Sequence, residues 1–145
     1  MMRFHHAGIF TLHPQRMLNF YIKKLGFKKE SQTVLPEHTV FSLFKVKKDC
    51  RMLKLSRDEA VLEIFWFSQE RIRPQLAERS PAVAGYNHLG IEVNDREQFC
   101  SRLNNKFGIK IIKISRGEHY AYFIRDPDKN LIEVRHPQKS LLSYG

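Results

Sequence analysis

The chain has few cysteines, few acidic residues and no long apolar run. Its two cysteines, Cys50 and Cys100, do not form a CxxC pair, which fits a reducing compartment, so we expect a cytoplasmic protein. No apolar run approaches the roughly 20 residues of a membrane span. The opening residues MMRFHHAGIF lack the apolar core and cleavage pattern of a signal peptide. We therefore expect neither a signal peptide nor a membrane segment.

The shortage of acidic residues gives the chain a strong positive charge. Lys and Arg total 25 against 15 Asp and Glu, for a formal net charge of +10. Such a surface favours anionic partners: a small carboxylate, a phosphate-bearing cofactor or nucleic acid. A solvated surface with a basic bias is the alternative. The basic runs form no recognised RNA or DNA motif, so we expect a small anionic substrate and no nucleic-acid partner.

An internal duplication is the most informative feature that is present. Residues 6–28 read HAGIFTLHPQRMLNFYIKKLGFK and residues 88–110 read HLGIEVNDREQFCSRLNNKFGIK. One offset (88 − 6 = 82) pairs His6 with His88, and the same offset pairs two glycines, Gly8 and Gly90. The repeat predicts two modules of one architecture.

Each copy also carries a glutamate inside an apolar run. Glu63 lies in Val-Leu-Glu-Ile and Glu133 in Leu-Ile-Glu-Val. A single strand histidine is usually structural, and a single strand glutamate often pairs with arginine or faces solvent. Four such residues at matched positions of a duplication instead favour a ligand set. Two imidazoles and two carboxylates suit Ni, Co, Zn, Mn or Fe, so we predict a divalent metal held by His6, Glu63, His88 and Glu133.

The pattern along each copy predicts a βαβββ module, and hence the α+β class. In the first copy we expect strands at 4–12, 30–35, 39–46, 51–55 and 60–67 and a helix from His13-Pro14 to Gly26. In the second we expect strands at 88–93, 109–115, 119–125 and 131–135 and a helix capped by Asn94-Asp95 and closed by Gly108.

The two offsets of the repeat differ. The glutamates are separated by 70 residues (133 − 63) and the histidines by 82, so the first copy holds about twelve extra residues, which we place near 36–50. We expect one domain over 1–145, built from module one at 4–67, a connection at 68–85 and module two at 86–137. A short helix at 74–79 is expected inside the connection.

Strand alternation predicts which side chains share a face. His6, Gly8 and Phe10 fall on one face of the first strand, and His88, Gly90 and Glu92 on the equivalent face of its counterpart. The glycine two residues after each histidine leaves space above the strand, as a ligand pocket requires. His5 falls on the opposite face and is expected to pack or to support His6.

These residues resemble a known superfamily. Paired βαβββ modules with strand-borne His and Glu, FYIKKLGF after the first strand and YAYFIRDPDKNLIEV near the end are similar to the vicinal oxygen chelate superfamily. Its members include glyoxalase I, methylmalonyl-CoA epimerase, extradiol dioxygenases, fosfomycin-resistance thiol transferases and bleomycin-binding proteins. The resemblance covers about residues 4–137. Lys129 departs from it, since this turn usually has glycine there.

The resemblance implies a fold, a site and a reaction. It implies a cup-shaped mixed sheet around a metal, with the ligand positions at His6, Glu63, His88 and Glu133. A glutamate at position 63 is more similar to glyoxalase I and the epimerases, which implies a lyase or isomerase that stabilises an enediolate or enolate. Glu133 and Glu63 are then the candidate catalytic bases, with Glu133 slightly favoured.

The resemblance also implies an oligomeric state, and it leaves the thiol cofactor and several alternative functions open. It implies a homodimer, and the site then lies within one chain or across two. A thiol cofactor stays unassigned, because the glutathione-contacting residues of glyoxalase I are not matched. A metal-dependent dioxygenase, a thiol transferase and a non-catalytic small-molecule-binding protein are the alternative functions.

Overall fold

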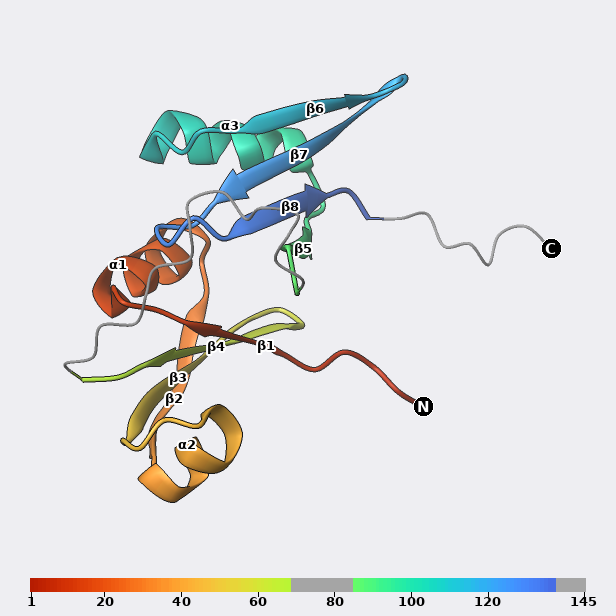
Figure 1. Ribbon diagram of the computed structural model, residues 1–145. Helices are drawn as coiled ribbons and strands as arrows, with labels where there is room; N and C mark the ends of the chain where they lie inside the picture. The colour runs from red at the N-terminus through yellow and green to blue at the C-terminus, as the bar shows by residue number, and fades with distance from the viewer. Residues whose placement is uncertain (69–84, 138–145) are drawn as a thin grey trace. The chain divides into compact units, whose positions relative to one another are not determined.

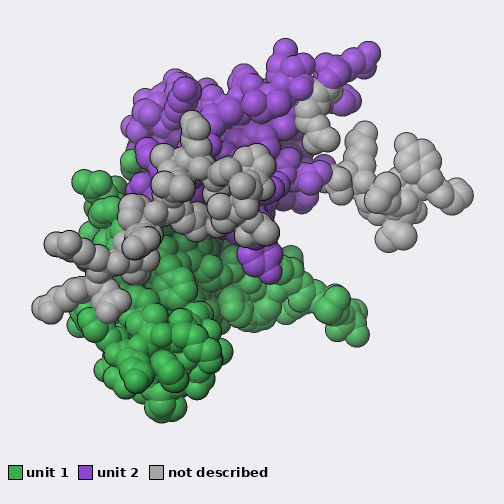
Figure 2. All heavy atoms as spheres, viewed as in Figure 1, with its two compact units in different colours: residues 1–77 green, residues 78–145 purple. Residues whose placement is uncertain are grey.

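Each half of the chain builds one mixed four-stranded sheet with its own helices. The computed structural model describes residues 1–68 and 85–137 (Figure 1). The chain divides into two compact units, residues 1–77 and 78–145, which Figure 2 separates by colour. Both sheets are open rather than closed into barrels. The predicted α+β class and the two tandem βαβββ modules are confirmed.

Unit 1 has the strand order β1-β4-β3-β2, in which β1 runs parallel to β4 and the other pairs are antiparallel. Its elements are β1 (Ala7–Phe10), α1 (Pro14–Leu18) continued by a π-helical segment (Asn19–Lys24), β2 (Lys28–Leu35), α2 (Glu37–Phe44), β3 (Cys50–Arg57) and β4 (Ala60–Trp66). The first strand thus pairs with the last one.

Unit 2 repeats this topology with the order β5-β8-β7-β6 and a parallel β5–β8 pair. Its elements are β5 (His88–Glu92), α3 (Arg96–Phe107), β6 (Ile112–Arg116), β7 (His119–Arg125) and β8 (Leu131–Arg135). Two sequences that share few residues beyond the repeat motif therefore fold alike, because the same pattern of strands, caps and turns recurs in both.

The helix ends follow the predicted local signals. Pro14 occupies the first turn of α1, where its missing N–H costs nothing. The Asp95 carboxylate caps α3 by accepting from the Gln98 backbone N–H at 2.9 Å. Gly26 and Gly108 close the two helical segments with positive φ angles of 77° and 64°, a conformation that glycine adopts without strain.

The strand predicted at 39–46 is wrong, because residues 39–44 belong to helix α2. The β-branched and aromatic composition of Thr39–Phe44 favoured a strand, yet Pro36 precedes the helix and Glu37 places an acidic side chain in its first turn. Val40 is fully buried and anchors the helix. The helix lies within 36–50, where the first copy was predicted to carry its extra residues.

Most buried apolar side chains lie on one face of each sheet. In unit 1, α1 and the π-helical segment bring buried side chains to the sheet face that carries Leu62 and Ile64. Helix α2 lies on the opposite face (Figure 1). Cys50 and Cys100 are buried and free, and burial raises the pKa of the Cys50 thiol to about 11. Both cysteines therefore serve as core residues.

Part of the predicted organisation lies outside the described residues. The connection predicted at 68–85, with its short helix at 74–79, falls almost wholly within 69–84, and the chain after 137 is likewise not described. Within the described ranges, no helix is long and apolar enough to cross a membrane.

The turn between β7 and β8 holds a residue in an unfavourable conformation. The buried Asp126 carboxylate accepts hydrogen bonds from the backbone N–H groups of Asp128 and Asn130, at 3.0 and 2.9 Å. These bonds set the turn, and Lys129 within it has a φ of 69°. A residue with a Cβ pays about 1–2 kcal/mol for this left-handed conformation.

We expect Lys129→Gly to raise the free energy of unfolding by about 0.5–1 kcal/mol, because glycine adopts a positive φ freely while losing some chain entropy on folding. Urea unfolding followed by circular dichroism measures the change. Lys129→Ala, which keeps a Cβ, should give no gain, and Lys106→Gly in the last turn of α3 should lower stability. Equal effects of glycine and alanine at position 129 would contradict the strain argument.

Candidate metal centre

The first histidine–glutamate pair forms in unit 1. The parallel register of β1 and β4 sets Gly8 beside Glu63, and His6 precedes Gly8 by two residues on the same face. The Nε2 atom of His6 lies 3.4 Å from Oε2 of Glu63. The Glu63 side chain is only 17% exposed, while that of His6 is 42% exposed. The carboxylate is therefore sheltered and the imidazole covers it from solvent.

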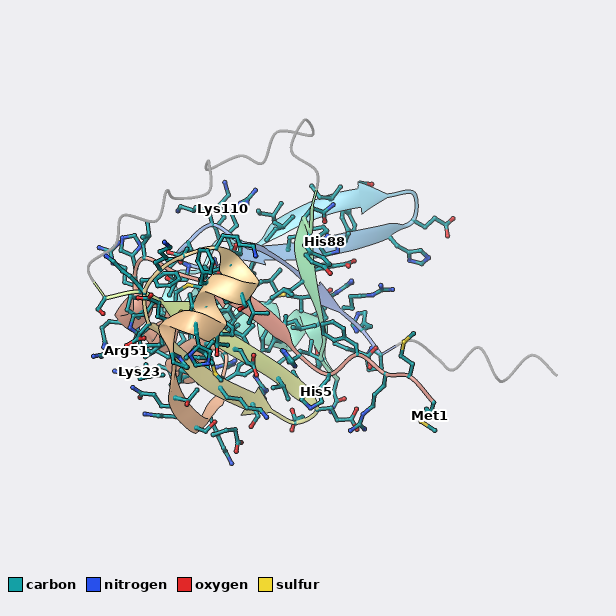
Figure 3. The ribbon with its side chains drawn as sticks, turned by 60° about the horizontal axis from the view of Figure 1, so that its bottom comes forward. Met1, His5, Lys23, Arg51, His88 and Lys110 are labelled. Atoms are coloured by element: carbon teal, nitrogen blue, oxygen red, sulfur yellow. The ribbon has the colours of Figure 1, made fainter. Side chains whose placement is uncertain are left out.

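The second pair repeats this geometry in unit 2. Gly90 is the register partner of Glu133, and His88 starts strand β5 on the same face (Figure 3). The Nε2 atom of His88 lies 3.4 Å from Oε2 of Glu133, and the two side chains are 37% and 16% exposed. Distance and burial thus agree between the two pairs.

Burial of neighbours explains why each glutamate faces this side. In β4, Leu62 and Ile64 are buried in the core, so Glu63 between them must point to the opposite face. Ile132 and Val134 constrain Glu133 in the same way. A sheltered carboxylate needs a polar partner or a cation, since an unpaired one costs several kcal/mol, on the order of 2–7. In each unit the histidine supplies that partner.

The second ring nitrogen of each histidine is also engaged. Nδ1 of His6 lies 2.8 Å from Nδ1 of His5, and Nδ1 of His88 contacts Oδ1 of Asn87. His5 and Asn87 occupy matched positions of the repeat (87 − 5 = 82). In both units the preceding residue therefore engages Nδ1 and leaves Nε2 directed at the carboxylate. Hydrogen bonding of this kind commonly orients metal-binding histidines.

The surroundings of the two pairs differ. An added Cβ at Gly90 would meet nothing within 4 Å, which agrees with the predicted space above this strand. A Cβ at Gly8 would lie 3.1 Å from the Phe65 ring, so an aromatic side chain fills much of the equivalent space in unit 1. Across the antiparallel pairs, Lys54 is the register partner of Glu63 and Phe123 that of Glu133.

Within each unit, the structure brings one predicted histidine beside one predicted glutamate. Among residues 1–68 and 85–137, no group of three or more His, Cys, Asp and Glu gathers within one prospective metal site. Each pair offers one imidazole nitrogen and one carboxylate oxygen, which first-row divalent ions accept. Sequence reasoning did not identify Asn87, although its 82-residue offset from His5 is the available signal.

Comparison with known proteins agrees with this geometry. Residues 3–134 match the Glyoxalase/Bleomycin resistance protein/Dioxygenase superfamily, the vicinal oxygen chelate group. The chain belongs to this superfamily. The match covers both modules and all four residues of the histidine–glutamate pairs.

The chain is also similar in sequence or fold to individual members of the superfamily. Glyoxalase I of Saccharomyces cerevisiae is 28% identical over 141 residues, which is 91% of this chain, and the chain spans 42% of the length of that relative. A glyoxalase family protein from Enterococcus faecalis is 27% identical with a TM-score of 0.66, over 91% of this chain and 95% of that one. The trypanothione-dependent glyoxalase I of Leishmania major shares the fold at 21% identity and a TM-score of 0.66, over 94% and 87% of the two chains.

We expect Gly90→Ala and Gly8→Ala to differ in stability. Alanine at position 90 enters open space and restricts the unfolded chain, so the free energy of unfolding should stay equal or rise by up to about 1 kcal/mol. Gly8→Ala should have a free energy of unfolding about 1 kcal/mol lower than that of Gly90→Ala, because the Phe65 ring must move to make room for the new methyl group. Paired urea titrations measure both, and equal stabilities would show that Phe65 does not restrict Gly8.

Proposed function

We propose that the chain acts as a divalent-metal-dependent lyase or isomerase of the glyoxalase type. The observation that carries the proposal is the repeated pair, with a histidine Nε2 3.4 Å from a glutamate Oε2 in both units. Membership of the superfamily and the likeness to yeast glyoxalase I support it. His6, Glu63, His88 and Glu133 are the proposed ligands, from one chain or from two copies of it.

The chemistry of these residues fits such an ion. Two imidazole nitrogens and two carboxylate oxygens suit Ni, Co, Zn, Mn or Fe, and both imidazoles already direct Nε2 toward the carboxylate. When bound, the cation polarises adjacent substrate oxygens and stabilises the negative charge that develops on them. The protein's own contribution is to orient the ligands through His5 and Asn87 and to accept the proton that leaves the substrate carbon.

We assign proton transfer to Glu133, with Glu63 as the second candidate. Burial does not rank the two carboxylates, because their side chains are 16% and 17% exposed. Their cross-strand neighbours do differ: Phe123 stands beside Glu133, whereas the cation Lys54 stands beside Glu63. Lys54 places positive charge on the face of unit 1 that carries Glu63, and this suits an anionic substrate.

The proposal includes a small anionic substrate, a homodimer and a cytoplasmic location, and it leaves the thiol cofactor open. Oxygen-dependent turnover would indicate a dioxygenase instead, and consumption of a thiol would indicate a transferase. A binding protein without catalysis would hold its small molecule after chelator treatment and in Glu63→Ala. The complete set of four donor residues favours the metal-dependent enzyme over this last alternative.

We expect the purified chain to contain near-stoichiometric divalent metal when it is prepared without chelator and without nickel affinity resin. Elemental mass spectrometry measures the metal per chain. His6→Ala and His88→Ala should each lower the metal content at least tenfold, because each removes one imidazole donor, whereas the exposed His38→Ala should not. A metal-free protein that also refuses added Ni, Co, Mn, Fe and Zn would overturn the proposal.

We expect Asn87→Ala to weaken cobalt binding about tenfold, since loss of an outer hydrogen-bond partner of a metal ligand typically costs this much or more. Titration of the metal-free protein with Co²⁺, followed by visible absorption, measures the affinity. Asn87→Asp keeps an acceptor for His88 Nδ1 and should retain binding. Asn105→Ala, on the exposed face of α3, is the matched control. Unchanged affinity in Asn87→Ala would show that Asn87 does not orient His88.

A further inference from the structure

Helix α2 exposes an aromatic side chain that the sheet of unit 1 does not need. Val40 is fully buried and Phe44 packs on Phe10 with ring centroids 4.8 Å apart, so these residues anchor the helix. Phe41 is instead 42% exposed. In unit 2, residues 117–118 alone separate β6 from β7, so the equivalent hairpin closes without a helix. The outer side of α2 therefore needs another explanation than closure of the sheet.

Two lysines lie over the exposed ring of Phe41. The Nζ atoms of Lys45 and Lys47 are 5.7 and 5.6 Å from its centroid, where the negative face of the ring attracts a cation. We call these three residues the basic–aromatic patch. Residues 38–48 contain no Asp or Glu, and neither lysine forms an ion pair with any residue that the structure describes. The positive charge of the patch is therefore not neutralised there.

The acidic residues next to α2 lie at its other end. Oδ1 of Asp49 accepts a hydrogen bond from the Glu37 backbone N–H at 2.8 Å, and Glu37 is itself in the first turn. The positive end of the helix dipole stabilises carboxylates at this end. Lys45 follows the last residue of α2, so the basic–aromatic patch begins where the helix ends. Charge is thus separated along the helix, with the cations gathered around Phe41.

Lys45 holds its position in an unfavourable backbone conformation. Its φ is 61°, in the left-handed region that disfavours a residue with a Cβ, and helices commonly end on glycine there, as α3 does at Gly108. The Lys45 ammonium donates to the Ser42 carbonyl at 3.4 Å, a long and weak hydrogen bond. Strain of this kind is a reason to look for function, and the side chain that it retains belongs to the basic–aromatic patch.

We propose that the basic–aromatic patch is a docking surface for an acidic segment of another protein. Carboxylates of that segment contact Lys45 and Lys47, and an apolar side chain contacts Phe41. Charge complementarity argues for this occupant, since two ammonium groups without ion-pair partners flank one exposed ring. A lipid surface fits less well, because α2 turns Val40 and Phe44 toward the sheet and so lacks an outward apolar face for insertion. The inference does not depend on the proposed metal site.

The test titrates the full-length chain into a fluorescein-labelled peptide of glutamates and phenylalanines at low salt, with fluorescence anisotropy as the readout. We expect Lys45→Gly and Lys47→Gln each to weaken binding about threefold, and the double variant about tenfold, because each removes one exposed ion pair. Phe41→Ala should weaken binding to a similar extent. A peptide with glutamine in place of glutamate should bind at least about tenfold more weakly, since it carries no charge to pair with the lysines.

Lys129→Gly is the matched control. Lys129 also has a positive φ, at 69°, and lies in the turn between β7 and β8 of unit 2, so the variant makes the same chemical change and the same loss of charge. It should leave peptide affinity unchanged. Lys45→Gly relieves a strained residue, so urea unfolding should show no loss of stability, which separates weaker binding from unfolding. Equal peptide affinities of the two glycine variants would overturn the inference.

Further outcomes assign the patch to another occupant. Cosedimentation with phosphatidylserine vesicles that is lost in the Lys45→Gly/Lys47→Gln variant would point to a lipid surface and overturn the inference. Dissociation of an oligomer by the same variant would point to a second copy of the chain, and failure of the wild type to bind the peptide would also overturn it. Metal content should equal that of wild type in every variant, so these outcomes do not bear on the proposed function.

Discussion

The parallel pairing of first and last strand is the constraint on which each unit's candidate site depends. It places Gly8 opposite Glu63 and Gly90 opposite Glu133, and so brings each histidine near a carboxylate. A shift of one residue would turn every side chain of the strand to the other face. The buried Ile64 opposes such a shift in β4, because the shift would turn Ile64 toward solvent and the Glu63 carboxylate into the core.

Core packing and site chemistry are therefore produced by the same residues. Alternation along β4 and β8 sends apolar side chains to one face and a glutamate to the other. The hydrophobic core fixes the register with the large energy of apolar burial. The register then holds the histidine Nε2 and the glutamate Oε2 3.4 Å apart in each unit. An ion pair between long surface side chains is too weak to fix such a geometry by itself.

Duplication followed by divergence accounts for the difference between the units. The histidine–glutamate pairs and the residue that contacts the histidine Nδ1 recur at matched positions, and the strand topology is the same. The neighbouring facing residues are Phe10 and Phe65 in unit 1 but Glu92 and Arg135 in unit 2. The residues around the two histidine–glutamate pairs, rather than the pairs themselves, therefore distinguish the two units.

Local sequence signals predicted the parts of the fold that depend on few residues. Pro14, the Asp95 cap and the closing glycines Gly26 and Gly108 act within one helical turn, so sequence alone placed these ends correctly. The segment at 39–46 was mistaken for a strand, because its strand-forming composition gave no sign of the packing that buries Val40 in a helix.

The candidate site divides in the same way between sequence and tertiary structure. The repeat by itself determined which residues correspond between the two copies: His6 corresponds to His88, and Glu63 to Glu133. Tertiary structure decided that each histidine meets the glutamate of its own unit, and that Phe44 reaches Phe10 and Phe65. The reason is physical: these contacts join residues distant in sequence, and only strand register and core packing set their distances.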